Sequence, residues 1–344
     1  MQHRDLNGID SMRDRLVYFE TGSTDPFYNL AFEEVVLSRK TEQEYLILWQ
    51  NDKTVVVGQN QNTSAEINPE FIEQNGIRVV RRQTGGGAVY HDLGNLNYSF
   101  VANVGNADEL MKERFTAPVV AALQALELDA EASGRNDILV SGCKVSGTAQ
   151  RILGKRILHH GTLLFDSDLE TVSEALRVDP LKFESKGIQS VRSRVGNIRS
   201  FLSEDMDLAA FWDHLKKTLA RDGFIEGSLT NEELAAVGRL RETKYSTWEW
   251  NYGRSPKYRF TGKQKWAGGL LEIRLAVEAG CIEDIVIYGD FLSVLSVDEI
   301  EAALKGCRMT REDVAAVLNR FPLAGYFGGI TRDEVIETMF RAVQ

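Results

Sequence analysis

The first two thirds of the sequence alternate short strand-like runs with single helices, and this pattern limits the fold more than any other feature. Residues 16–20, 45–49 and 96–101 read as strands. Helical spacing of apolar residues appears in separate segments, such as residues 107–126. A doubly wound α/β chain would place a helix after almost every strand. The pattern therefore favours an α+β fold, in which a mixed sheet carries flanking helices.

Local signals refine this outline. Asp25-Pro26 provides a helix cap and a first-turn proline. The polar turn Asn51-Asp52-Lys53 predicts a hairpin between residues 45–49 and 54–58. Further strands are expected at residues 77–81, 138–140, 144–149 and 157–165, and further helices at residues 169–176, 208–221 and 231–242.

Residues 248–265 are rich in aromatic, glycine and basic residues without a sustained period, and we place a domain boundary there. A large domain would span residues 1–255, with residues 1–14 as an extension or a frayed end, and a small α+β domain would span residues 262–344. The signals in the small domain are a predicted hairpin of residues 271–277 and 282–288, and capping-box patterns at Ser296-Val297-Asp298-Glu299 and Thr331-Arg332-Asp333-Glu334.

Charge and composition exclude several classes of protein. A net charge of −10 disfavours general nucleic-acid binding, which needs a surplus of Lys and Arg. No apolar run reaches the roughly 18 residues of a membrane span, and the N-terminus lacks the apolar stretch of a signal peptide. We therefore expect a cytoplasmic protein. The three cysteines form no CxxC pair, which disfavours a disulfide framework or a structural zinc site.

The most specific segment is Arg81-Arg82-Gln83-Thr84-Gly85-Gly86-Gly87-Ala88-Val89-Tyr90-His91-Asp92. Three successive glycines let backbone N–H groups approach a ligand closely, and two arginines precede them. This combination suits a carboxylate or a phosphate. A flexible hairpin turn would explain the glycines alone, but not the flanking Arg-Arg and His-Asp pairs.

A single lysine, Lys144, stands between two Ser-Gly pairs in the segment Ser141-Gly142-Cys143-Lys144-Val145-Ser146-Gly147. Among apolar neighbours its charge is costly unless an anion neutralises it. A bound ligand could supply that anion, or Asp137 could pair with it. A lysine whose stem packs while its ammonium reaches water is the third alternative.

Two further segments carry polar groups that could meet a ligand. In His159-His160-Gly161-Thr162 only one histidine can face a pocket, because adjacent strand residues point to opposite faces, so the pair cannot chelate a metal. One buried and one exposed histidine is the alternative. Residues 185–198 combine serine, glycine and basic residues, as expected of a cationic lid or of a disordered surface loop.

In this order and spacing the segments resemble the lipoate-protein ligases, relatives of biotin ligases and octanoyltransferases. Residues 81–92 look like the lipoate-binding loop of that family, Lys144 looks like its essential lysine, and residues 185–195 look like its adenylate-binding loop. The chain from about Gly262 resembles the accessory domain of the two-domain form. Thr84 replaces the serine that relatives often carry, but it keeps the hydroxyl. A P-loop is absent, so the resemblance implies that ATP is bound in another way.

The resemblance implies a two-step reaction. Lipoate and Mg²⁺-ATP would give enzyme-held lipoyl-AMP, and a lysine of an acceptor domain, in a 2-oxoacid dehydrogenase E2 subunit or the glycine cleavage H protein, would then attack it. Lys144 would be the electrostatic catalyst, and Asp137 a candidate Mg²⁺ ligand. The implied substrate- and ATP-binding residues are Arg81, Arg82, Thr84, Gly85, Gly86, Gly87, Ala88, Val89, Tyr90, His91, Asp137, His160, Thr162, Ser190, Arg192 and Arg194.

Two alternatives to a ligase remain open on the sequence. An acyltransferase that carries octanoyl or lipoyl groups as a thioester on Cys143 would need no ATP, although Cys143 has no evident base beside it. A non-catalytic protein that binds lipoate or a lipoylated domain would not turn over ATP, and the basic loop would then have no obvious purpose.

Overall fold

The computed structural model describes residues 16–104, 112–134, 136–176, 195–220, 224–252, 260–278 and 280–341. The chain divides into two compact units. One is drawn from residues 1–54, 91–173 and 189–245, and the other from residues 55–90, 174–188 and 246–344.

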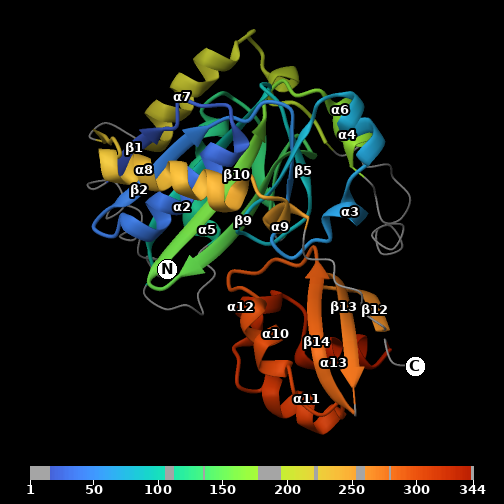
Figure 1. Ribbon diagram of the computed structural model, residues 1–344. Helices are drawn as coiled ribbons and strands as arrows, with labels where there is room; N and C mark the ends of the chain where they lie inside the picture. The colour runs from blue at the N-terminus through green and yellow to red at the C-terminus, as the bar shows by residue number, and fades with distance from the viewer. Residues whose placement is uncertain are drawn as a thin grey trace, which may run out of the picture. The chain divides into compact units, whose positions relative to one another are not determined.

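An eight-stranded mixed sheet forms the centre of the first unit (Figure 1). Its strand order is β11-β1-β2-β6-β10-β9-β8-β7. The pairs β11-β1 and β1-β2 are parallel, and the remaining pairs are antiparallel. The predicted α+β fold with a mixed sheet is confirmed. The strands span Leu16–Glu20 (β1), Glu44–Trp49 (β2), Asn95–Asn103 (β6), Ala130–Ser133 (β7), Asp137–Val140 (β8), Cys143–Leu153 (β9), Arg156–Leu164 (β10) and Ile225–Glu226 (β11).

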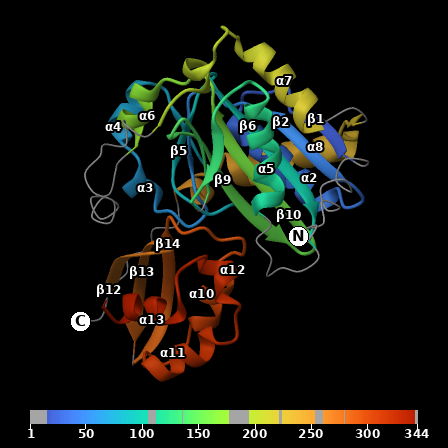
Figure 2. The ribbon, with the colours of Figure 1, turned by 180° about the vertical axis from the view of Figure 1, so that it is seen from behind.

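Helices cover both faces of this sheet. α2 (Pro26–Arg39) and α8 (Asn231–Leu240) pack together on one face (Figure 1), and α5 (Lys112–Gln124) and α7 (Leu208–Ala220) pack on the other (Figure 2). The predicted start of α2 is confirmed, because the Asp25 carboxylate accepts a hydrogen bond from the Phe27 amide at 3.1 Å. The shorter elements are α6 (Leu169–Ala175), the 3-10 helix η3 (Ile198–Phe201) and the π-helical turn η4 (Arg241–Tyr245).

The hairpin predicted between residues 45–49 and 54–58 is wrong. β2 belongs to the large sheet, whereas β3 (Thr54–Val57) joins β4 (Arg78–Arg81) and β5 (Val89–His91) in a separate three-stranded sheet. The intervening Asn51 is completely buried, and its side chain is hydrogen-bonded to Asn29 and His91. Asn51 is thus a residue type that favours turns, but here it lies in a buried connection between two sheets. Composition alone cannot distinguish such a connection from a hairpin turn. Two short helices, α3 (Thr63–Glu66) and α4 (Pro69–Gln74), follow β3.

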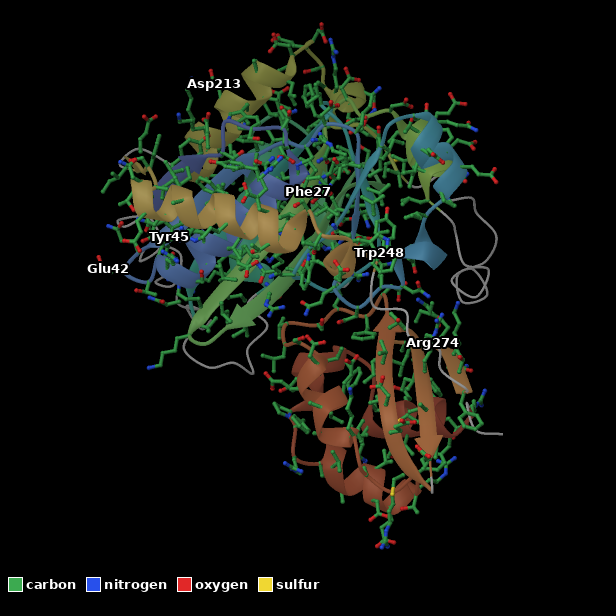
Figure 3. The ribbon with its side chains drawn as sticks, in the orientation of Figure 1. Phe27, Glu42, Tyr45, Asp213, Trp248 and Arg274 are labelled. Atoms are coloured by element: carbon green, nitrogen blue, oxygen red, sulfur yellow. The ribbon has the colours of Figure 1, made fainter. Side chains whose placement is uncertain are left out.

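Residues 260–341 contribute a three-stranded antiparallel sheet and a group of helices to the second unit. Leu271, Ile273 and Leu275 are fully buried against these helices, whereas Arg274, labelled in Figure 3, lies with its guanidinium 5.2 Å from the centroid of the Tyr288 ring. The predicted alternation of residues 271–277 is confirmed. The elements are α9 (Trp248–Asn251), β12 (Phe260–Trp266), β13 (Gly269–Glu278), β14 (Cys281–Gly289), α10 (Asp298–Leu304), α11 (Arg311–Leu318), α12 (Leu323–Phe327) and α13 (Arg332–Arg341).

One of the two predicted capping boxes is confirmed. Thr331 N donates to the Glu334 carboxylate at 2.7 Å, and Glu334 N donates to Thr331 Oγ1 at 3.3 Å, at the start of α13. The box predicted at Ser296 is wrong. α10 has Val297 at its N-cap, without a side-chain hydrogen bond, and the Ser296 hydroxyl donates to Asp298 instead.

Two glycine substitutions test the packing of the first unit. An added Cβ at Gly161 would lie 2.5 Å from the hydroxyl oxygen of Tyr98, whose side chain is fully buried, so we expect Gly161→Ala to lower the free energy of unfolding by about 1–3 kcal/mol. Gly238 lies within α8, and a Cβ there meets open space, so Gly238→Ala should stabilise by about 0.5–1 kcal/mol. Urea unfolding measures both changes. Equal effects of the two variants would contradict this packing.

Candidate functional site

Arg81 is a buried arginine that comes just before the glycine-rich loop in the sequence. Its side chain is 1% exposed, and Nη1 donates to the carbonyl oxygens of Gly58, Gln59 and Gln61 at 2.9, 2.8 and 2.7 Å. Nη2 donates to Thr63 Oγ1 at 2.7 Å. A guanidinium buried in this way is stabilised because carbonyl groups surround its donors. Arg81 therefore shapes the backbone between β3 and α3.

Arg82 shapes the loop itself. Its Nη2 donates to the carbonyl oxygens of Gly85 and Gly87 at 2.6 and 2.8 Å, and its Nε donates to Thr84 Oγ1 at 2.9 Å. The hydroxyl at position 84 thus has a defined partner. Gly86 has a φ of +88°, a conformation that other residues rarely adopt. The turn is therefore held in one conformation by Arg82 and is preorganised rather than flexible.

Other residues of the second unit lie along the same turn. The Gly86 amide donates to the carbonyl oxygen of Phe291 at 3.1 Å, and the Asn60 side-chain amide donates to Ser293 Oγ at 3.0 Å. A Cβ at Gly85 would lie 2.7 Å from Ser293 N. Of the remaining predicted loop residues, Ala88 and Val89 are half-buried, and Tyr90 is buried.

Lys144 lies at the start of β9 in the first unit. Its Nζ is 2.7 Å from Asp137 Oδ1, and the two side chains are 36% and 34% exposed. The ammonium also lies across Gly147, because a Cβ there would be 3.3 Å from Nζ. The structure therefore shows the pairing with Asp137, and about one third of the Lys144 side chain also remains exposed to solvent. Both groups remain accessible to a small anion or cation from solvent.

Thr162 and His160 share one face of the sheet with Gly147. The Gly147 amide donates to Thr162 Oγ1 at 3.1 Å, and His160 lies two residues before Thr162 on β10. His160 Nδ1 is 2.9 Å from Glu33 Oε1, a carboxylate of α2. The sheet therefore brings Lys144, Asp137, Thr162 and His160 onto neighbouring strands of the first unit.

The two adjacent histidines face opposite sides of the sheet, as predicted, but the alternative of one exposed histidine is wrong. His159 is fully buried, with its ring stacked 5.2 Å from Phe115 of α5, and Gln150 Nε2 lies 2.8 Å from its Nδ1. The Tyr98 ring also stacks on the His159 ring, with the ring centroids 6.2 Å apart, and burial raises the pKa of the Tyr98 phenol. His159 is thus a core residue.

His91 is held on the first unit by buried neighbours. Its Nδ1 lies 3.1 Å from Asn51 Nδ2, and the Trp49 ring meets its ring edge-on. Asn51 is in turn bonded by Asn29 of α2 at 2.9 Å. Sequence reasoning missed Asn29 and Glu33. The sequence did contain a signal for them, because Asn29 and Glu33 are polar residues four positions apart in an otherwise apolar part of this helix.

Some predicted residues cannot be placed. Ser190, Arg192 and Arg194 lie outside the described residues, as does most of the predicted loop at residues 185–198. Within the described ranges, no three His, Cys, Asp or Glu side chains gather closely enough to hold a metal ion by themselves. None of the helices described has the length and apolar character that a membrane crossing requires.

Two protein families match successive parts of the chain. Residues 25–220 match the lipoyl protein ligase A/B catalytic domain, and residues 255–339 match the bacterial lipoate protein ligase C-terminus. Lipoate-protein ligase 1 of Staphylococcus aureus is 43% identical over 318 residues, covering 92% of this chain and 97% of its own. A lipoate-protein ligase of Bacillus subtilis is likewise 43% identical, over 321 residues, with the same two coverages.

Solved structures agree with these relatives. A lipoate complex of LipL1 from P. falciparum superposes with a TM-score of 0.77 at 24% identity, covering 95% of this chain and 99% of its own, and supports the fold alone. A lipoate-protein ligase A bound with ATP is 32% identical, with a TM-score of 0.60 and coverage of 70% and 99%. A bipartite ligase from Thermoplasma acidophilum, described with its E2 lipoyl domain, is 33% identical, with a TM-score of 0.62 and coverage of 72% and 99%.

The two family matches together span most of the sequence, and relatives 43% identical are covered almost from end to end. The chain belongs to the lipoate-protein ligase family of enzymes.

Proposed function

We propose that this protein activates lipoate with ATP to lipoyl-AMP, and then transfers the lipoyl group to a lysine of an acceptor domain. The observation that carries the proposal is the accessible Lys144 ammonium, held across Gly147 on the sheet face of Thr162 and His160. A ligase of this family has been solved with ATP bound, and another with lipoate bound. We assign residues 1–255 to this chemistry and residues 262–344 to an accessory domain.

The first step joins two anions. An oxygen of the lipoate carboxylate attacks the α-phosphorus of ATP, the bond from that phosphorus to the bridging oxygen breaks, and pyrophosphate leaves. Lys144 would lower the repulsion between the carboxylate and the phosphate, because its positive charge attracts both anions. In the ligand-free arrangement Asp137 neutralises that charge at 2.7 Å. Binding of the two anions would exchange one counter-charge for another.

The second step makes an amide. The ε-amine nitrogen of the acceptor lysine attacks the acyl carbon, the bond to the AMP oxygen breaks, and AMP and a proton leave. Lys144 can hydrogen-bond the carbonyl oxygen as negative charge develops on it. We assign to the glycine-rich turn held by Arg82 the binding of an anionic group through its backbone amides. A ligand that accepts a hydrogen bond from the Gly86 amide would replace the Phe291 carbonyl oxygen as the acceptor.

Mg²⁺ would accompany ATP, and Asp137 is the residue proposed to bind it. A partly exposed carboxylate is the donor that Mg²⁺ prefers, and Mg²⁺ in nucleotide sites is commonly held by one or two carboxylates together with phosphate oxygens. A single acid thus fits a metal carried mainly by the substrate. When bound, Mg²⁺ would neutralise charge on the phosphates.

The role of Lys144 is tested by its removal. We expect Lys144→Ala to lower the rate of lipoate-dependent pyrophosphate release by about 10²–10³-fold, because the preorganised cation at the reacting groups is lost. Lys155, exposed in the turn after β9, gives the matched control, and Lys155→Ala should keep the wild-type rate. Unchanged pyrophosphate release in Lys144→Ala would contradict the assignment.

The role of Asp137 is tested by the Mg²⁺ dependence of the same reaction. If Asp137 binds the metal, Asp137→Asn should raise the Mg²⁺ concentration needed for half-maximal activity by about tenfold or more. The control is Asp129→Asn, at an exposed position before β7, which should leave that concentration unchanged. If Asp137→Asn keeps the wild-type Mg²⁺ dependence, Asp137 serves only to pair with Lys144.

The acceptors are tested by intact mass. Incubation with lipoate, Mg²⁺ and ATP should add one lipoyl group to an isolated E2 lipoyl domain and to a glycine cleavage H protein, and replacing the acceptor lysine by arginine should prevent the addition. Transfer from a thioester on Cys143 would not need ATP. Acceptor modification by a lipoyl donor in the absence of ATP would therefore overturn the ligase proposal in favour of a transferase.

A further inference from the structure

Glu33 is a buried carboxylate for which the two-step reaction gives no role. It lies on α2, and its side chain is 1% exposed. Its Oε1 accepts a hydrogen bond from Ser99 Oγ at 2.6 Å and lies 2.9 Å from His160 Nδ1. The Ser99 hydroxyl is fixed in turn, because Trp49 Nε1 donates to it at 2.8 Å. A carboxylate is retained at such depth only where donors surround it.

The contact with Glu33 decides how the His160 ring is protonated and turned. An ionised carboxylate can only accept hydrogen bonds, so Nδ1 of His160 must carry the proton. In the neutral ring Nε2 is then an acceptor, and the ring cannot flip without losing its bond. His160 itself is 7% exposed, on the sheet face shared with Gly147 and Thr162. Glu33 therefore fixes both the tautomer and the orientation of a ring beside the Lys144 region.

A second residue of α2 holds the other predicted histidine. Asn29 is four residues before Glu33, on the same side of the helix, and its Nδ2 donates to Asn51 Oδ1 at 2.9 Å. Asn51 then contacts His91 Nδ1 at 3.1 Å. One helix face thus reaches two histidines through buried polar groups. Packing alone would favour apolar residues at both positions, because each buried polar group is costly unless it is bonded.

We propose that Glu33 is a positioning residue for lipoate activation, and that it acts through His160 by holding the ring as the Nδ1-protonated tautomer with Nε2 as an acceptor. This inference rests on the proposed ligase function. It assigns to α2 a role in arranging the site, in addition to covering the sheet. Because Glu33 acts through His160, its removal should matter only while His160 is present.

Three substitutions separate positioning from structural support. Glu33→Ala removes the acceptor and should lower kcat/KM for lipoyl-AMP formation on the order of 100-fold, the size expected for a misplaced group in a reacting site. Glu33→Gln keeps a carbonyl oxygen for Nδ1 and should recover activity to within about tenfold of wild type. Ser99→Ala removes the other donor to Glu33 Oε1 but leaves the contact with His160. This variant should keep the wild-type tautomer of His160, although the stability of the protein falls.

The decisive readout is a double-mutant cycle with His160→Ala, with all rates normalised to the folded fraction from urea unfolding. Positioning through His160 requires that Glu33→Ala causes no further loss of kcat/KM in the His160→Ala background. Multiplicative losses would mean that Glu33 only supports the fold, and would overturn the proposal.

The tautomer is measured independently by ¹⁵N NMR of the histidine rings, which number five in the chain and can be assigned by single substitutions. The proposal is supported if Nδ1 of His160 carries the proton in the wild type and in Glu33→Gln, and if this tautomer is no longer fixed in Glu33→Ala. A proton on Nε2 in wild type overturns it. Absence of lipoyl-AMP formation by wild type would instead reject the ligase function, and it would leave the tautomer result standing.

Discussion

A lysine ammonium held across a glycine, with one carboxylate as its counter-ion, is the interaction on which the proposed chemistry depends. Lys144 Nζ lies 2.7 Å from Asp137 Oδ1, and a Cβ on Gly147 would lie 3.3 Å from the same nitrogen. A Cβ at position 147 would require the end of the Lys144 side chain to shift by a few tenths of an ångström. Both members of the pair are about one-third exposed, so the pair is screened by water and contributes little to stability. That weakness suits a site in which the counter-ion must be exchanged for substrate anions.

In the described part of each unit, buried polar groups contribute rigidity. The Arg81 guanidinium donates to backbone carbonyls and to the Thr63 hydroxyl, and so holds the backbone between β3 and α3. The Arg82 guanidinium donates to Thr84 and Gly85, and so defines the glycine-rich turn. On the first unit, Asn29 and Glu33 reach His91 and His160 through buried bonds. Both arrangements use fully buried polar groups, which keep their geometry because breaking any bond leaves an unsatisfied partner.

Much of this fold could be predicted from the sequence, because strands with one buried face alternate visibly and helix caps have local signatures. The strand at residues 271–277 and the capping box at Thr331 are examples. β12 was missed because Phe260–Trp266 shows no alternation of apolar and polar residues. The hairpin after β2 was wrong because strand pairing depends on partners that are distant in the sequence. The roles of Glu33 and Asn29 could not be predicted. Glu33 meets Ser99 and His160, which are 66 and 127 residues away, and Glu33-Glu34 looks like an exposed helix face.

The fate of a carboxylate oxygen tests the central claim most directly. If Lys144 brings lipoate and ATP together to form lipoyl-AMP, lipoate labelled with oxygen-18 in its carboxyl group should deliver one labelled oxygen to the phosphate of the AMP released on acceptor modification. Mass spectrometry of that AMP gives the answer. AMP without the label, or ADP as the nucleotide product, would contradict the account.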